Sequence, residues 1–280
     1  MSGKIITVTS GKGGVGKTTV TANLAVALAS MGHSVAAIDT DIGLRNLDIV
    51  MGLESRIVYD LVDVAEGRCH LSQALIKDRQ LPSLCLLPAS QTSNKTAISP
   101  HELGLIAAEL RASNDFVFID SPAGIEQGFQ NAISTADQII IVTTPEVTAV
   151  RSADRVIGLI ETSGKKPGQL IINRIRPAMV RQGDMLNTYD VIEFLAIDLL
   201  GVIPDDEAII IAANKGKPMS GDPTSLAGHA FRNIAQRLTG ETVPFLPILE
   251  ERAGLWSRVR AAARRGLNSL SHPRKMGSRS

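Results

Sequence analysis

The stretch GKGGVGKTT, residues 11–19, directly follows the apolar run KIITVT at residues 4–9. It fits the pattern G-x-x-x-x-G-K-[ST], a glycine-rich loop between a strand and a helix. The glycines let backbone N–H groups curl around phosphate oxygens, and the following helix adds the positive end of its dipole. Lys17 would neutralise the β- and γ-phosphates, and the Thr18 hydroxyl would face Mg²⁺. The stretch therefore predicts a nucleoside-phosphate site.

Short runs rich in Val and Ile alternate with segments of helical periodicity along most of the chain. Continuous apolar runs are typical of strands buried on both faces, and this alternation implies βαβ crossovers. The predicted strands are 4–9, 34–39, 84–88, 116–120, 138–142, 169–173 and 200–203. The predicted helices are 17–31, 100–113, 146–163, 188–197 and 223–239. The sequence thus predicts an α/β fold: a doubly wound, mainly parallel sheet flanked by helices.

The composition excludes several classes of protein. With 44% of its 280 residues hydrophobic, the chain is not mostly disordered. No uninterrupted apolar run approaches the ~20 residues of a membrane span, and residues 1–4 lead into a strand without a signal peptide. Cys69 and Cys85 are too few for a disulfide framework and wrongly spaced for a CxxC site. We expect two ordinary buried thiols in a reducing cytosol.

The near-neutral net charge of +1 hides a basic C-terminus. Residues 251–280 carry eight Lys and Arg and one Glu, a net charge of +7, which leaves −6 for the rest of the chain. The segment before this basic region, residues 240–249, contains two prolines, which interrupt helix formation. The predicted organisation is a nucleotide-binding domain at 1–240, a linker at 241–249, an amphipathic helix at 250–271 and a basic tail at 272–280.

The predicted C-terminal helix has an apolar and a basic side. A helix of this kind can lie in an anionic membrane interface, where each basic residue contributes ~1 kcal/mol. The predicted membrane-binding residues are Leu255, Trp256, Val259, Leu267 and Leu270 on the apolar side, and Arg258, Arg264 and Arg265 on the other. Two alternatives stay open: the helix docks on the domain with its arginines solvated, or the basic extension binds nucleic acid.

Acidic and polar residues follow several of the predicted strands. Asp120 ends the run FVFID, where a carboxylate beside the phosphate loop is placed to hold the Mg²⁺ shell. Gly124 follows and could bring a backbone N–H near the γ-phosphate. The backbone at Pro204 and Asp205, which ends another strand, can line a pocket for the base.

A second lysine inside the loop, Lys12, makes the stretch resemble the deviant Walker A motif of the ParA/MinD family of P-loop ATPases. The resemblance implies ATP and Mg²⁺ as cofactors and a homodimer when ATP is bound. It implies that Lys12 reaches the nucleotide of the partner subunit, where a second cation stabilises the transferring phosphoryl group. It also implies that Asp41 positions or activates the attacking water, that Asp39 belongs to the metal and loop network, and that Asn173 contacts the adenine edge.

These expectations define the predicted site. The predicted catalytic residues are Lys12, Lys17, Asp41 and Asp120. The predicted ATP contacts are Gly11, Lys12, Gly13, Gly14, Val15, Gly16, Lys17, Thr18, Thr19, Gly124, Asn173, Pro204 and Asp205. The predicted metal ligands are Thr18, Asp39 and Asp120.

Further segments narrow the resemblance to the MinD branch, the family's regulators of bacterial cell division. The matching segments are 41–52, 58–64, 73–78, 86–92, 120–126, 144–147, 181–185 and 201–206. The resemblance implies an ATPase that attaches to the cytoplasmic face of the inner membrane and recruits a MinC-like division inhibitor to control septum placement. Hydrolysis of ATP, stimulated in many species by a MinE-like activator, would release the protein from the membrane. Two tails in one dimer would bind membrane by avidity.

The family's partner surface corresponds to residues 146–154. Arg151 and Asp154 are the predicted partner-binding residues, whereas Ser152 stands where well-known members carry an acidic residue. The main alternative is a ParA-like DNA-partitioning ATPase whose basic tail binds DNA, with steep salt dependence. A reductase of the nitrogenase iron-protein type would need cysteine ligands that the motifs do not supply. A kinase-like metabolic enzyme would need a second-substrate motif, and none is visible.

Overall fold

An eight-stranded sheet forms the centre of the computed structural model, which describes residues 3–94, 97–166, 168–222 and 224–246. Its strands run in the order β3-β4-β2-β5-β1-β6-β7-β8, and only the short β3 is antiparallel to its neighbour. Their bounds are β1 Lys4–Thr9, β2 Val35–Asp39, β3 Ile76–Lys77, β4 Leu84–Leu87, β5 Phe116–Asp120, β6 Gln138–Thr143, β7 Gln169–Ile175 and β8 Leu199–Pro204. The predicted mainly parallel sheet is confirmed.

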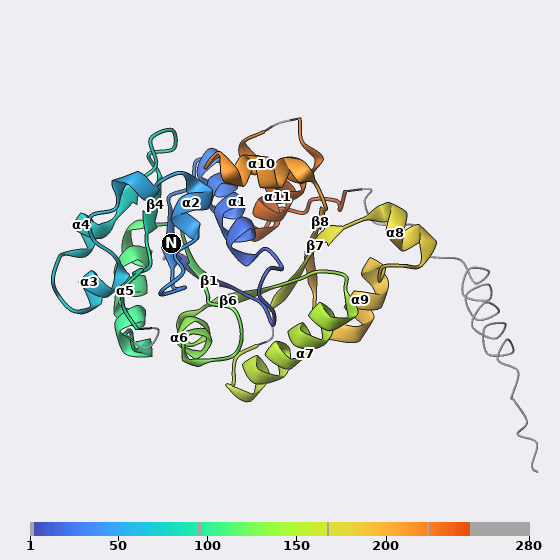
Figure 1. The fold of residues 1–280 in the computed structure, drawn as a ribbon, viewed down its shortest axis with the longest axis horizontal. Helices are drawn as coiled ribbons and strands as arrows, with labels where there is room; N and C mark the ends of the chain where they lie inside the picture. Colours follow the sequence, from blue (N-terminus) through green and yellow to red (C-terminus); the bar gives the residue numbers. More distant parts are fainter. Residues whose placement is uncertain (1–2, 95–96, 167, 223, 247–280) are drawn as a thin grey trace, which may run out of the picture.

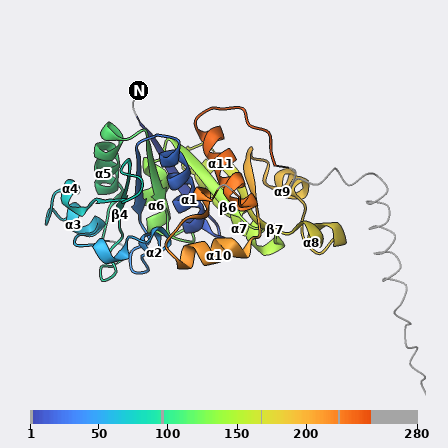
Figure 2. The same cartoon turned by 90° about the horizontal axis from the view of Figure 1, so that it is seen from above.

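Helices cover both faces of this sheet (Figure 1). One face carries α1 (Lys17–Ser30), α2 (Leu47–Met51), α10 (Glu207–Asn214) and α11 (Leu226–Leu238). The other face carries α5 (Pro100–Ser113), α6 (Gln127–Thr135), α7 (Val147–Thr162) and α9 (Thr188–Leu195). Seen from above, α3 (Leu61–Ala65) and α4 (Leu71–Ala74) lie at one end of the molecule, and α8 (Pro177–Gln182) lies at the other (Figure 2). Two 3₁₀ turns span Glu54–Arg56 and Met219–Gly221.

The core is apolar on both faces because the central strands are apolar along most of their length. Every residue of β2 and of β5 is buried. Leu24 and Leu28 of α1 pack with Phe231 of α11 on one face, while Ile139 of β6 packs in a cluster with α6, α7 and α9 on the other. Burial of each such side chain contributes about 1.5–3 kcal/mol, which keeps the carboxyl ends of the strands in fixed register.

The predicted strands, and the helices predicted within residues 17–239, are all present, with ends that differ by a few residues. The predicted helix 188–197 ends at Leu195 because Ala196 adopts a left-handed φ of 53°. The short elements β3, α2, α3, α4, α6, α8 and α10 were not predicted. Cys69 and Cys85 are free thiols of intermediate burial, so the prediction of two buried thiols is met only in part. Both pack at the margin of a core cluster instead of inside it.

The C-terminal predictions fall largely outside the described residues, because the membrane-binding residues and the helix 250–271 all follow Leu246. Within the described ranges, none of the helices combines the length and the apolar character needed to cross a membrane.

Candidate functional site

The predicted site residues converge at the carboxyl edge of the sheet. β5 lies between β1 and β2, so that Val8 pairs with Asp120 and Asp39 pairs with Asp120 across the strands. The phosphate loop follows β1 at this same edge. Crevices outside the carboxyl ends of parallel strands are the usual ligand sites of doubly wound folds.

The loop itself depends on glycine at two turning points. Gly14 and Gly16 have φ angles of 80° and 98°, which side chains rarely adopt. The Ser10 hydroxyl donates to the Lys12 carbonyl oxygen at 2.9 Å, which fixes the start of the loop. Lys17, the first residue of α1, is buried in the site.

The start of α1 is prepared for an anion. Gly16 precedes the helix and offers no side chain to its first N–H groups. By contrast, Ser99 and Glu102 cap α5 with reciprocal hydrogen bonds. An uncapped helix start leaves backbone donors for a ligand, and its dipole favours a negative one. The geometry is that of a phosphate cradle.

Asp120 is fully buried beside this cradle. Its Oδ1 lies 3.1 Å from the Thr21 hydroxyl, which comes from the second turn of α1. Burial raises the pKa of Asp120, whereas the charge of Lys17 and the hydroxyls of Thr18 and Thr21 oppose that rise. A carboxylate held near a lysine and two hydroxyls is suited to the hydration shell of a magnesium ion.

Asp39 organises the loop that follows β2. One carboxylate oxygen accepts the N–H of Asp41 at 2.9 Å, and the other accepts those of Asn46 and Leu47 at 3.2 and 3.1 Å. Burial, followed by the charge of Asp120, raises the pKa of Asp39 to about 7. The loop role predicted for Asp39 is present, and its part in metal binding stays a prediction.

The donor set fits Mg²⁺ bound together with a nucleotide. Mg²⁺ keeps several waters and typically takes one or two protein oxygens plus phosphates. Asp120 and the Thr18 hydroxyl, which interact with each other, supply such oxygens. Within the described residues, no cluster of three or more His, Cys, Asp and Glu side chains forms a metal cage by itself.

Lys12 lies at the surface, next to α7. Its side chain is exposed, and Nζ lies 3.5 Å from Oγ1 of Thr148, in the first turn of α7. Partner-binding residues predicted on the same helix, Arg151 and Asp154, are exposed. The two loop lysines therefore occupy different environments, one buried and one at the surface.

The residues predicted to contact the base lie beside the phosphate loop and at the end of β8. The Asn173 amide donates to the Val15 carbonyl oxygen at 2.8 Å, and a β-carbon on Gly16 would come within 2.3 Å of the Asn173 amide nitrogen. Pro204 is buried at the end of β8, and the Asp205 carboxylate lies 2.5 Å from Nε of Arg176. The structure thus brings Asn173 to the loop, while contact with a base stays a prediction.

Two further predicted ATP contacts are Gly124, which follows β5, and Thr19, which lies in α1. Gly124 follows β5 with a φ of 95°, a conformation that favours glycine. Thr19 is half-buried in the first turn of α1.

Sequence reasoning missed three contacts at the site. It did not identify Thr21 as a partner of Asp120, although Thr21 lies four residues after Lys17 on the same side of α1. It also missed the contact of Lys12 with Thr148, which is 136 residues away. The third is the ion pair of Arg45 with the buried Asp48, 3.0 Å apart, which fixes the far end of the Asp39 loop.

Known proteins are similar to this chain over most of its length. The profile of the CobQ/CobB/MinD/ParA nucleotide binding domain matches residues 6–219. The septum site-determining protein MinD of Bacillus subtilis is 51% identical over 261 residues, covering 92% of this chain and 97% of that protein.

Solved structures are similar as well. The MinC:MinD cell division protein complex of Aquifex aeolicus matches with a TM-score of 0.82 and 45% identity, covering 88% of this chain and all of that one. MinD of Pyrococcus horikoshii complexed with Mg-ADP matches with a TM-score of 0.76 and 32% identity, covering 84% of this chain and 95% of that one.

Proposed function

This chain belongs to the CobQ/CobB/MinD/ParA nucleotide-binding family, in its MinD group of cell-division ATPases, and we propose that it works as an ATP-driven membrane switch. As a family member it hydrolyses ATP, and it takes part in the choice of the division site. In the proposed mechanism, ATP closes a homodimer, the dimer attaches to the cytoplasmic face of the inner membrane, and stimulated hydrolysis releases it.

The observation that carries the proposal is the position of Lys12. Lys17 is buried at the start of α1, where its charge faces Asp120. Lys12 is exposed on the same loop, with its ammonium group near α7. A cation at the surface can reach a nucleotide bound by a second subunit and add its charge to the transferring phosphoryl group.

The residues of the site have separate tasks in this proposal. Backbone N–H groups of residues 11–16 and the start of α1 hold the phosphates, and Lys17 neutralises their charge. Asp120 and Thr18 hold the magnesium ion, which supplies charge neutralisation at the phosphates. Asp41, whose N–H is fixed by Asp39, orients the attacking water. Asn173, Pro204 and Asp205 surround the base.

Partner recognition is proposed on α7. Arg151 and Asp154 are exposed on this helix, whose first turn also receives Lys12. A MinC-like inhibitor would bind this surface in the ATP dimer, and a MinE-like activator would stimulate hydrolysis from the same surface. The complex of MinC with the Aquifex aeolicus relative supports the first of these partners.

Membrane attachment is proposed for the C-terminal segment 250–271. Its apolar edge at Leu255 and Trp256 would enter the lipid interface, and its arginines would pair with anionic headgroups. One tail binds weakly, and two tails in one dimer bind by avidity.

Light scattering tests the dimer directly. With Asp41→Ala to block hydrolysis, the mass of the protein is expected to double with MgATP and to stay that of a monomer with MgADP. A monomer in both nucleotides would overturn the proposed switch, although the phosphate site would stand.

A further inference from the structure

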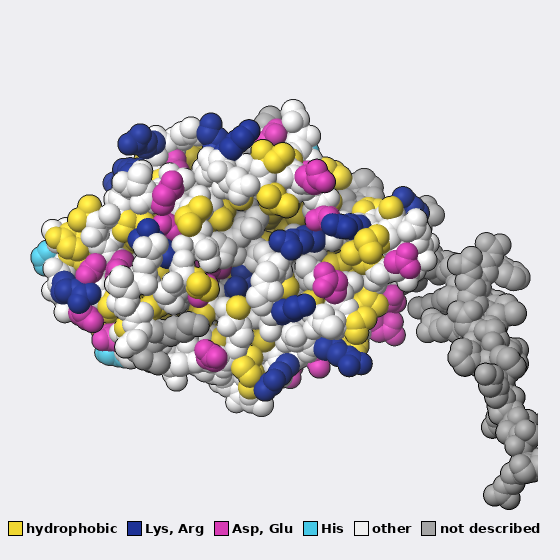
Figure 3. All heavy atoms as spheres, in the orientation of Figure 1, with side chains coloured by type: hydrophobic (Ala, Val, Ile, Leu, Met, Phe, Trp, Pro, Cys, Tyr) yellow, Lys and Arg dark blue, Asp and Glu magenta, His cyan; other side chains and the backbone are white. Residues whose placement is uncertain are grey.

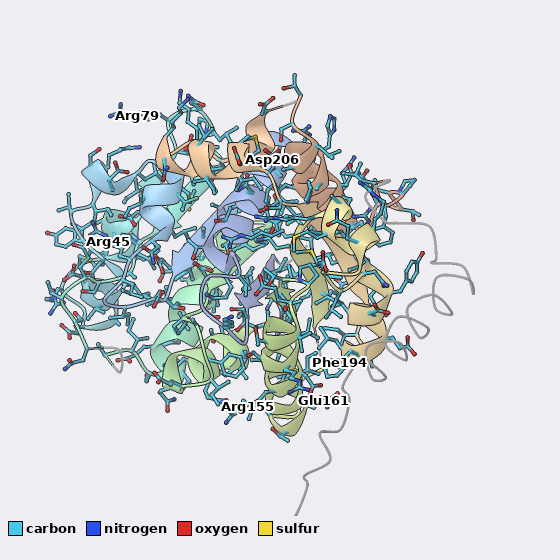
Figure 4. All side chains as sticks on the ribbon, turned by 45° about the vertical axis from the view of Figure 1, so that its right-hand side comes forward. Arg45, Arg79, Arg155, Glu161, Phe194 and Asp206 are labelled. Carbon is cyan, nitrogen blue, oxygen red and sulfur yellow. The ribbon has the colours of Figure 1, made fainter. Side chains whose placement is uncertain are left out.

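The outer side of α9 combines aromatic and acidic side chains. Phe194 and Tyr189 are 53% and 45% exposed, and Asp190 and Glu193 are exposed between them. Figure 4 shows Phe194 at the outer corner of the molecule near Glu161 of α7, the helix on which α9 packs. Hydrophobic and acidic side chains lie next to one another over this region in the space-filling view (Figure 3). We name Tyr189, Asp190, Glu193 and Phe194 the α9 face.

The charged residues of the α9 segment itself are all of one sign. Residues 183–198 contain four acidic residues and no Lys, Arg or His. The C-terminal residues 251–280 have the opposite character, with a net charge of +7 and an apolar edge that includes Leu255 and Trp256. An apolar and acidic face is complementary to an apolar and basic segment, because the hydrophobic and the electrostatic interactions favour the same contact.

A second exposed apolar surface lacks this complementarity. Ile210 and Ile211 of α10 are 60% and 53% exposed, with the acidic Asp206 and Glu207 before them and Lys215 and Lys217 after them. These mixed charges favour a basic partner less than the all-acidic α9 segment does. Charge therefore favours the α9 face over α10 for the C-terminal segment.

The chain also leaves the folded body at a fixed point. The Arg237 guanidinium donates to the carbonyl oxygens of Leu200, Val243 and Pro244 at 3.1, 3.1 and 2.8 Å. It also stacks over the Phe245 ring, 4.2 Å from its centroid. Arg237 thus ties residues 243–245 to β8, although a linker was predicted there.

This tie places the start of the tail beside β8 and α11. Leu246 lies with Val202 of β8 and Ile234 of α11, and it packs against both core clusters, one of which also contains Val191 and Leu195 of α9. Trp256 follows Leu246 by ten residues, which span up to about 35 Å when extended. The eight-residue α9 is only about 12 Å long, so the tail can reach all of it.

We propose that the C-terminal segment 250–271 docks on the α9 face of its own subunit when the protein is away from a membrane. Leu255 and Trp256 cover Phe194, and the tail arginines face Asp190 and Glu193. The docked tail is unavailable to lipid, and the tie at Arg237 keeps its local concentration at α9 high.

The consequence for regulation rests on the proposed membrane function, whereas the docking itself does not. A single subunit that docks its tail binds membrane less than its free tail would. A tail that is docked roughly nine-tenths of the time weakens vesicle binding about tenfold. Docking would therefore sharpen the difference between a monomer and a two-tailed dimer.

Trp256 is the single tryptophan of the chain, so its fluorescence reports the tail without any label. The test uses the full chain with MgADP and without vesicles. Docking predicts that Trp256 emits at a shorter wavelength than free N-acetyltryptophanamide and is less quenched by acrylamide. The double variant Asp190→Lys with Phe194→Ala is expected to move both values toward those of the free compound.

A matched control exists on α5. Leu105 and Glu109 are exposed there and are spaced four residues apart, as are Asp190 and Phe194. Leu105→Ala with Glu109→Lys likewise truncates one exposed hydrophobic residue and reverses one acidic charge, but away from α9, and is expected to leave the fluorescence of Trp256 unchanged. Glu193→Lys alone gives a milder second variant that keeps the aromatic residue, with a smaller shift in the same direction.

Three results would overturn the proposal: a Trp256 that is as exposed as the free compound in the unaltered chain, equal shifts in the α9 and α5 variants, or protection that grows with protein concentration. The last would place the tail on a second copy. Vesicle binding separates the two proposals, because the α9 variants should bind vesicles more strongly in MgADP only if the tail also binds membrane.

Discussion

The backbone of Ser152 lies directly against Gly11, so that a β-carbon built on Gly11 would come within 2.0 Å of the Ser152 carbonyl oxygen. The phosphate loop and α7 are therefore in backbone contact, with no side chain between them. Because α7 also carries the proposed partner residues, Arg151 and Asp154, a partner that moves this helix would act on the loop without an intermediate element.

Substitution of Gly11 tests this contact. Gly11→Ala would press a methyl group into the backbone of α7, and overpacking of this kind costs about 1–3 kcal/mol. We expect a lower free energy of unfolding in urea and weaker MgADP binding by calorimetry. The matched control is Gly13→Ala, because a β-carbon there has 3.8 Å to its nearest neighbour, Ala123. Equal losses in the free energy of unfolding of the two nucleotide-free variants would contradict the account.

Substitution of the two loop lysines should impair different steps, ATP binding in one case and dimerisation in the other. Lys17→Ala removes the charge that faces the phosphates inside its own subunit, so ATP binding is expected to fall sharply. Lys12→Ala leaves the buried site intact because Lys12 is exposed, so ATP should still bind while the dimer and partner-stimulated hydrolysis are lost. Nucleotide titration and light scattering on the same samples separate these results. Loss of ATP binding in Lys12→Ala would show that the lysine acts within its own subunit.

Thr21 provides a donor for the buried Asp120. Thr21→Val keeps the shape and removes the hydroxyl that lies 3.1 Å from the carboxylate, at a cost of about 1–3 kcal/mol for a buried group left without that donor. We expect lower stability and a higher Mg²⁺ concentration for half-maximal ATPase activity. Thr162→Val, an exposed site at the end of α7, is the control. An unchanged Mg²⁺ requirement would mean that Thr21 only fills space.

The raised pKa of Asp39 predicts a pH dependence of the nucleotide-free protein. Its pKa of about 7 exceeds the ordinary 3.8, so the folded state binds this proton more tightly than the unfolded state. The stabilisation is complete below the unfolded value and is lost as pH rises through about 7. Over that range the stability of the unaltered chain should fall relative to Asp39→Asn by up to about 4 kcal/mol. Chemical unfolding from pH 4 to pH 8 measures it, and parallel curves for the two proteins would refute it.

The sequence revealed the strands because each is a continuous apolar run buried on both faces. It did not reveal β3, because two residues carry no periodicity and that strand exists only by pairing with Leu86 and Cys85. The short helix α3 was missed for a related reason: its five residues depend on a capping box at Asp60. Elements of this size depend on tertiary contacts more than on their own periodicity.

The sequence predicted which residues form the candidate site more completely than it predicted the contacts between them. The spacing of the phosphate loop and the strand-terminal carboxylates identified Lys17 and Asp120. The Asp39 carboxylate accepts backbone N–H groups of Asp41, Asn46 and Leu47, and this depends on the path of a loop, which local sequence does not determine. The contact of Lys12 with Thr148 likewise depends on how α7 packs, since the two residues lie on different elements.

The most direct test of the central claim, an ATP-driven membrane switch, is co-sedimentation with anionic and neutral vesicles in MgATP and in MgADP, with a variant ending at residue 249 as the control. The account predicts binding to anionic vesicles that is strong in MgATP, weak in MgADP and absent without the tail. Binding that is equal in the two nucleotides, or a full-length protein that ignores vesicles but binds DNA in MgATP, would contradict it.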